Sequence, residues 1–179
     1  RPSTGRSSAR LAYGTHERSA IGFRVVLSVD AVKGAKSAPP ADGQGNLVFD
    51  GHTASVLAVC ISPDNQLIHS ASEDQTVRCW DRSGKERWKF DTGGVTYGLA
   101  ISPDGKSVAI GSAGGTFVLD ASSGEKRQQM SGKAAQTQGV AFTADGLQIA
   151  TTGIDGDVRL WDIGTGKEQR LFTRSGNTH

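Results

Sequence analysis

The sequence predicts an all-β chain in which a unit of four short strands occurs three times. A turn-forming tripeptide recurs as Ser62-Pro63-Asp64, Ser102-Pro103-Asp104 and Thr143-Ala144-Asp145, at intervals of 40 and 41 residues. A fixed period of this length indicates a repeat architecture. Glycine is abundant, with 24 residues against only 5 prolines, which suits many tight turns between short strands.

The stretch from residue 51 to residue 81 shows the unit most completely. It opens with Gly51-His52 and closes with Trp80-Asp81. The run VLAVCI at 56–61 is short and apolar, as expected for a strand that is buried on both faces. The Ser-Pro-Asp-Asn that follows favours a turn, because proline sets φ at the second turn position and asparagine tolerates positive φ. Further strands, separated by polar turns, are predicted at 67–71, 76–80 and 86–90.

Gly-His and Trp-Asp markers in a period near 40 residues resemble the WD40-repeat family, over roughly residues 46–179. The resemblance implies that each unit is a four-stranded blade of a β-propeller. The predicted repeats run over about 51–90, 91–130 and 131–172. Because closed propellers have typically 4 to 8 blades, three blades make an incomplete propeller. We expect residues 46–50 to be the outer strand of a preceding blade, because they match the last strand of the later repeats.

The resemblance also implies a buried polar network in the first blade, made of His52, Ser70, Asp74 and Trp80. A buried indole N–H or imidazole that lacks a partner costs about 1–3 kcal/mol, so these groups need one another. A carboxylate, a histidine and a serine are also the components of a hydrolase triad. Their fixed position in the repeat explains all of them, and no nucleophile elbow surrounds Ser70. We therefore interpret the set as structural.

The second repeat replaces every member of that network. The residues at the corresponding positions are Thr92, Ile110, Gly114 and Leu119. Replacing a whole polar network by apolar groups can be nearly neutral, whereas removal of a single partner is costly. We therefore expect the second blade to fold around an apolar core.

The third repeat keeps part of the network. Thr151, Asp155 and Trp161 stand at the expected positions, but Lys133 replaces the histidine. A buried carboxylate still needs a partner. We therefore expect water or Lys133 to complete this site.

The composition argues against several classes of partner and cofactor. A net charge of +2 does not favour nucleic acid, and no apolar run is long enough to span a membrane. The four histidines show no metal-ligand spacing. Gly105-Lys106-Ser107 matches the end of a phosphate-binding loop but falls at a hairpin turn instead of a strand-to-helix turn. We expect no cofactor and no metal.

The two cysteines predict the compartment. Cys60 and Cys79 fall on the first and third strands of one blade, with another strand between them. We interpret them as free thiols in the core. Free thiols favour a reducing compartment, and a cytoplasmic location is the expectation.

Residues 1–45 differ from the repeats. Residues 1–27 are basic and end in Ile-Gly-Phe-Arg-Val-Val-Leu, which resembles the C-terminal end of the formylglycine-generating-enzyme (sulfatase-modifying factor) family. No cysteine occurs in residues 1–50, so no catalytic role is carried over from that family. Residues 28–45 read as a linker, because they are small and polar and contain Pro39-Pro40.

We expect a non-enzymatic protein-interaction scaffold within a larger multidomain protein. Positions that could contact a protein partner are Arg82, Lys85 and Trp88. For Trp88, on an outer strand, the favoured alternative is that its side chain covers the edge of the blade. One alternative is a fragment of a formylglycine-generating-enzyme-like protein whose propeller recruits substrates or partners. Another is a partial propeller that self-associates through its open blade edges.

Overall fold

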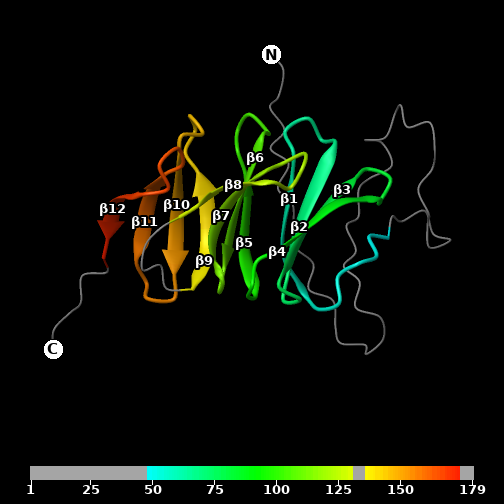
Figure 1. Ribbon diagram of the computed structural model, residues 1–179, viewed down its shortest axis with the longest axis horizontal. Helices are drawn as coiled ribbons and strands as arrows, with labels where there is room; N and C mark the ends of the chain where they lie inside the picture. Colours follow the sequence, from blue (N-terminus) through cyan, green and yellow to red (C-terminus); the bar gives the residue numbers. More distant parts are fainter. Residues whose placement is uncertain (1–47, 131–135, 174–179) are drawn as a thin grey trace, which may run out of the picture.

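The chain folds into three separate four-stranded antiparallel sheets. The computed structural model describes residues 48–130 and 136–173. Within these two ranges there are twelve strands and no helix (Figure 1). The predictions for residues 1–27 and 28–45 concern segments that lie outside the described residues. The prediction of an all-β chain with three four-stranded blades is confirmed.

Each sheet contains four strands that are consecutive in the chain and are paired in chain order. The first sheet contains β1 (Val56–Ile61), β2 (Leu67–Ser72), β3 (Thr76–Asp81) and β4 (Glu86–Asp91). The second contains β5 (Thr96–Ile101), β6 (Ser107–Ser112), β7 (Gly115–Asp120) and β8 (Lys126–Gln129). The third contains β9 (Thr137–Phe142), β10 (Gln148–Gly153), β11 (Val158–Asp162) and β12 (Glu168–Phe172).

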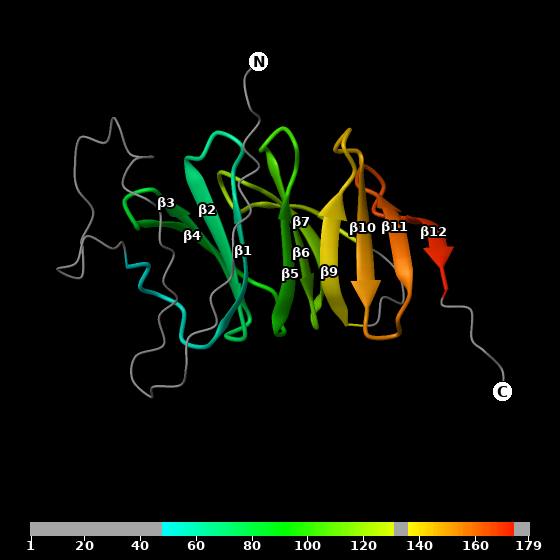
Figure 2. The same cartoon turned by 180° about the vertical axis from the view of Figure 1, so that it is seen from behind.

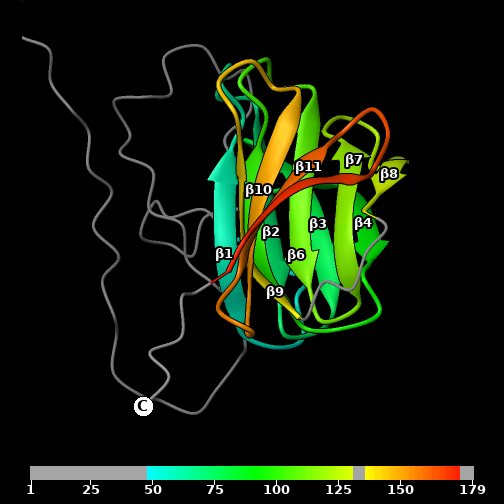
Figure 3. The ribbon, with the colours of Figure 1, turned by 90° about the vertical axis from the view of Figure 1, so that its left-hand side faces the viewer.

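The sheets stand side by side, with corresponding strands next to one another. Figure 2 shows the first strands β1, β5 and β9 in a row. Figure 3 looks along that row, with the first strands at one side and the fourth strands β4 and β8 at the other. The three sheets are therefore stacked like successive blades around an axis near the first strands.

Two hydrophobic cores hold the sheets together. Between the first and second sheets, Val77 and Cys79 pack with Ile110 and Leu119. Between the second and third, Val118 packs with Ile149 and Trp161 in the second core. Ile110 and Leu119 stand where the first repeat has Ser70 and Trp80, so the second blade is held by an apolar core, as expected.

A second contact between neighbouring sheets involves glycines with positive φ. Gly124, in the turn from β7 to β8, has φ +76°, and a Cβ there would lie 2.6 Å from the indole of Trp88 on β4. Gly166 of the third sheet meets Gln128 on β8 in the same way, at 2.9 Å. Each turn thus rests on the outer strand of the preceding sheet, where only glycine fits.

The segment before β1 occupies a comparable place beside the first sheet. A Cβ on Gly84 would lie 3.1 Å from the backbone oxygen of Val48. Phe49 is buried and contacts Trp80 edge-on, with ring centroids 5.7 Å apart. No strand is formed at 48–50, but these residues cover the first sheet as an outer strand would.

Candidate functional site

A chain of hydrogen bonds crosses the first sheet and ends at a carboxylate. Trp80 Nε1 donates to Ser70 Oγ at 2.8 Å, and Ser70 Oγ lies 2.8 Å from His52 Nε2. His52 Nδ1 lies 2.8 Å from Asp74 Oδ2. Because a carboxylate only accepts, Nδ1 carries the proton and Nε2 accepts from the Ser70 hydroxyl. We call these four residues the polar brace.

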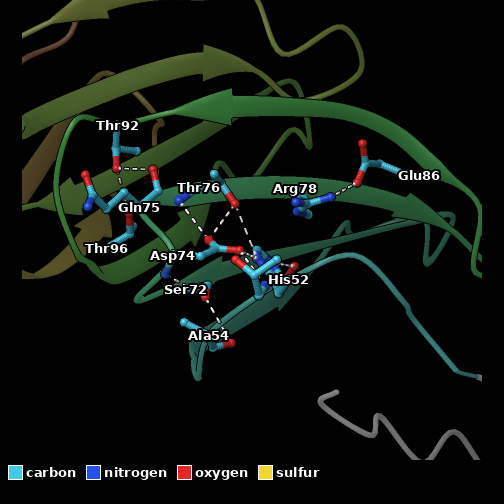
Figure 4. A network of polar contacts seen from close by, with 12 residues as sticks. His52, Ala54, Ser72, Asp74, Gln75, Thr76, Arg78, Glu86, Thr92 and Thr96 are labelled. Atoms are coloured by element: carbon cyan, nitrogen blue, oxygen red, sulfur yellow. Dashed lines mark hydrogen bonds and ion pairs between the residues drawn. The ribbon is translucent and has the colours of Figure 1, made fainter. Parts of the chain in front are cut away.

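The carboxylate of Asp74 is held by several further donors (Figure 4). Thr76 Oγ1 donates to Asp74 Oδ1 at 2.6 Å, and the backbone N–H of Thr53 donates to Oδ2 at 3.0 Å. Burial raises the pKa of Asp74, but the hydrogen bonds from Thr76, Thr53 and His52 outweigh it and hold the pKa far below its usual range. Asp74 is therefore ionised and fixes the turn between β2 and β3.

The histidine of the brace is neutral. Burial lowers the pKa of His52, against the raising effect of the hydrogen bond to Asp74. A neutral imidazole can both donate to Asp74 and accept from Ser70, as the brace requires.

The brace has the distances of a hydrolase triad but lacks an available nucleophile. Ser70 is fully buried, so no substrate reaches its oxygen. Its lone pair already accepts from the indole of Trp80. A serine in this setting joins two strands and is not placed to attack a carbonyl group.

The second sheet has a threonine cluster in place of the brace. Thr92, at the histidine position, donates through Oγ1 to the backbone oxygen of Gln75 at 2.8 Å (Figure 4). Its Oγ1 also lies 2.9 Å from Thr96 Oγ1, and both side chains are buried. The apolar replacements at Ile110 and Leu119 did not predict this polar contact. A Thr at the histidine position followed by a second Thr four residues later was the signal for it.

In the third sheet an arginine takes the place of the missing histidine. Trp161 Nε1 donates to Thr151 Oγ1 at 2.8 Å, as Trp80 does to Ser70. Asp155 accepts from Arg159 Nη2 at 2.7 Å, and Arg159 is only 7% exposed. Lys133 lies outside the described residues. The carboxylate is therefore satisfied by Arg159, a residue that the sequence interpretation did not consider.

The three positions suggested for partner contact differ in their accessibility. Lys85 is exposed and Arg82 is half-buried in the turn from β3 to β4. Trp88 is 8% exposed, and its Nε1 donates to the backbone oxygen of Ala121 at 3.1 Å. The suggestion that Trp88 is exposed to a partner is wrong, because the turn of the second sheet covers its indole.

His69 binds the same carbonyl as Trp88. Its Nε2 donates to the backbone oxygen of Ala121 at 3.0 Å, and its ring lies 5.4 Å from the Trp88 ring. Nδ1 of this fully buried histidine has no hydrogen-bond partner among the residues that the structure describes. His69 and Trp88 thus fasten the first sheet to the second through one backbone oxygen.

The described ranges contain neither a candidate metal site nor a candidate membrane-spanning helix. No group of three or more His, Cys, Asp or Glu residues there could hold a metal ion, and no helix there could cross a membrane. Cys60 and Cys79 are free. Burial raises the pKa of both thiols to about 12, so they are protonated and unreactive.

Comparisons with known proteins find the same repeat. The WD40 family (WD domain, G-beta repeat) matches residues 43–81 and 124–162. Both segments end in Trp-Asp, whereas the second repeat has Leu119-Asp120 at the corresponding position. The comparisons give no support to the formylglycine-generating-enzyme resemblance of residues 1–27.

Three curated relatives cover about two thirds of this chain. Periodic tryptophan protein 2 of Arabidopsis thaliana is 31% identical over 122 residues, which are 65% of this chain and 14% of the relative. Small ribosomal subunit protein RACK1y of Oryza sativa subsp. japonica is 30% identical over 123 residues, which are 64% of this chain and 37% of the relative. WD repeat-containing protein SL1-17 of Schistosoma mansoni is 29% identical over 126 residues, which are 69% of this chain and 42% of the relative. The chain spans less than half the length of these relatives.

Solved structures agree on the fold. The crystal structure of RRP9 WD40 repeats and the structure of U3-55K each match with a TM-score of 0.66 and 23% identity. Each match covers 70% of this chain and 41% of the solved chain. At this identity the likeness concerns the fold alone. The three stacked sheets, the brace between His52 and Trp80 and the two matched segments together show that this chain is built of WD40 repeats.

Proposed function

We propose that this chain is a non-catalytic protein-interaction scaffold and part of a larger protein. Its sheets are rigid, since buried side chains connect neighbouring sheets and the polar brace links the strands of the first sheet. The turns at their ends are therefore held in fixed positions, where they can present side chains to another protein. The proposal concerns binding and assigns no reaction to this segment.

The observation that carries the proposal is the burial of Ser70. Among the described residues, Asp74, His52 and Ser70 are the one set arranged in the order of a catalytic triad. The hydroxyl of Ser70 is hydrogen-bonded to both Trp80 and His52. This use supports a structural role for His52 and Asp74. It leaves the surface turns as the functional part of the molecule.

The relatives support the same conclusion. One is named a small ribosomal subunit protein, a component of a large assembly. We propose by analogy that this chain also works by holding proteins together, and that its partner is a protein instead of a nucleic acid or a membrane. The free thiols Cys60 and Cys79 support the further proposal of a reducing, cytoplasmic location.

Two measurements test the proposal. Treatment of the folded chain with a fluorophosphonate should leave its intact mass unchanged, because Ser70 is inaccessible. Affinity capture with the full protein, compared with the protein that lacks residues 51–172, should identify protein partners that bind through this region. Covalent labelling of Ser70 in the folded protein would contradict the proposal. So would the capture of the same partners with and without residues 51–172.

A second candidate, self-association, is favoured by one face of the first sheet. Leu57, Val59 and Ile61 are 41%, 45% and 39% exposed and alternate along β1 on the face turned away from the second sheet. An apolar row of this kind is a contact surface. We propose that copies of the chain associate through this row, and light scattering on the chain measures it.

A further inference from the structure

Four side chains form one row across the first sheet. Cys60, His69, Cys79 and Trp88 lie directly opposite one another on β1, β2, β3 and β4. Residues that are opposite on adjacent strands point to the same face of a sheet. Cys79 and Trp88 belong to the core between the first and second sheets, so His69, which is fully buried, lies in the middle of that interface.

One backbone oxygen of the second sheet fastens this row. Ala121 follows β7 and begins the turn to β8, and its oxygen accepts from His69 Nε2 at 3.0 Å and from Trp88 Nε1 at 3.1 Å. A carbonyl oxygen has two lone pairs, so both are used. A Cβ on Gly124 of the same turn would lie 2.6 Å from the Trp88 indole, so the turn packs directly on that ring. We call His69, Trp88 and the turn at 121–124 the latch.

The other nitrogen of the His69 ring has no partner. Because Nε2 donates to Ala121, the neutral ring has its lone pair on Nδ1, and this buried atom has no hydrogen-bond partner among the described residues. The neighbours of His69 in the row are the thiols of Cys60 and Cys79. Burial raises the pKa of both thiols to about 12, so they are neutral and supply no negative charge.

The charged groups near the latch do not compensate a charge on His69. Burial lowers the pKa of His69 and the bond to Ala121 raises it, and no charged group in the described ranges contributes to the shift. Asp81 and Arg87 act on Cys79, but they form an ion pair with each other at 3.9 Å. The described side chains that the second sheet adds to this core are apolar. A proton on Nδ1 would therefore place an unbalanced charge in an apolar interface.

His52, in the same sheet, is in the opposite situation. Its Nδ1 lies 2.8 Å from the carboxylate of Asp74, so a second proton on its ring would be balanced by a neighbouring negative charge. The core between the second and third sheets consists of apolar side chains over the described ranges. Acid should therefore weaken the interface between the first and second sheets at His69 and leave the next interface closed.

We propose that His69 is a proton-operated latch: protonation of its ring releases the turn at 121–124 from Trp88 and opens the outer part of the interface between the first two sheets. Opening admits water to Nδ1, and hydration stabilises a charged imidazole. The hydrogen bonds within each sheet are not involved, so the change is local and the strands stay paired. This inference goes beyond the proposed scaffold function and does not depend on it.

The direction of the pH dependence follows from the two environments of His69. In the open form the ring is hydrated and its pKa is near the ordinary value of about 6.5, whereas burial lowers the pKa in the closed form. Proton uptake therefore favours the open form as the pH falls below about 6.5. The ratio of open to closed molecules should rise by up to about tenfold per pH unit, and above that pH the latch should stay closed.

Nuclear magnetic resonance of the full chain, with isotopic nitrogen in the indole rings, tests the latch. Hydrogen exchange of the Trp88 indole, corrected for the intrinsic effect of pH, should quicken by up to about tenfold for each pH unit below about 6.5. Exchange of the Trp161 indole, in the third sheet, is the internal control and should not follow this curve. His69→Gln keeps a side-chain N–H for Ala121 but cannot gain a proton, so exchange at Trp88 in this variant should be independent of pH.

Three results would overturn the inference. The first is exchange at Trp88 that does not change as the pH falls, and the second is an equal rise at Trp161, which would indicate unfolding of the whole chain. The third is the same rise at Trp88 in His69→Gln as in the parent chain. If His69→Gln does not fold, the proton uptake of His69, followed by the resonances of its ring in the parent chain, replaces it. That uptake should coincide with the rise at Trp88, and a separate midpoint would contradict the latch.

Discussion

Substitution of Ser70 by alanine tests the polar brace most sharply. The change removes one oxygen that accepts from Trp80 and contacts His52, each at 2.8 Å. It leaves a buried indole N–H without an acceptor and a buried imidazole nitrogen without a donor. The loss of each of these two partners costs about 1–3 kcal/mol, so Ser70→Ala should lower the free energy of unfolding by about 2–6 kcal/mol.

The third sheet supplies a matched control. Thr151 accepts from Trp161 and, within the described ranges, forms no hydrogen bond with a histidine, and Thr151→Val keeps the shape of the side chain. This change leaves one group, the indole N–H of Trp161, without its acceptor and should cost about 1–3 kcal/mol. Urea unfolding followed by tryptophan fluorescence measures both values, provided that the m-value is unchanged. The reasoning is refuted if Ser70→Ala costs no more than Thr151→Val.

Three further outcomes are expected. Burial lowers the pKa of His69 below 6.5, so the contribution of the neutral imidazole to stability is complete above that pH and is lost as the pH falls, by up to about 1.4 kcal/mol per pH unit. The free energy of unfolding of His69→Phe, measured by denaturation, should therefore depend less on pH in this range. The same pH dependence in the variant and the parent would contradict this. Gly124→Ala places a Cβ against Trp88 and also strains a positive φ. Gly93→Ala, with φ +69° and no atom within 4 Å of the added Cβ, costs only the backbone strain of about 1–2 kcal/mol. Thermal unfolding should show the larger loss of stability for Gly124→Ala, and equal losses would show that the indole of Trp88 moves aside. Light scattering should find the chain associated and Val59→Lys monomeric, and a monomeric parent chain would exclude the apolar row as a contact.

The sequence predicted the number and order of strands well, because turn chemistry and period are local properties. The strand predicted at 86–90 forms at Glu86–Asp91, and those predicted at 67–71 and 76–80 likewise extend one residue further. The outer strand expected at 46–50 does not form over the described residues 48–50. The second blade was predicted although the WD40 family matches leave out its first three strands, β5 to β7. Its apolar replacements at Ile110 and Leu119 preserve the packing that the fold requires.

What the sequence did not reveal depends on contacts between sheets. Trp88 stands on an edge strand, and only the stacking of the second sheet shows that its indole is covered by Gly124. The pairing of Arg159 with Asp155 depends on the path of a long side chain across the sheet. The pairing of β1 with β2 skips Leu57, and that of β5 with β6 skips Tyr97. Each β-bulge alters strand register by one residue, which no hydrophobic pattern indicates in strands of this length.

Above all, the turns of a rigid set of sheets should be the surface that binds a protein partner. Hydrogen exchange of the full protein, measured alone and with a captured partner, tests this most directly. Binding should slow exchange in surface turns, such as those at 73–75, 92–95, 62–66, 102–106 or 143–147, and leave the interior strands β2, β6 and β10 unchanged. Unchanged exchange in every turn of residues 51–172 would contradict the proposed scaffold function.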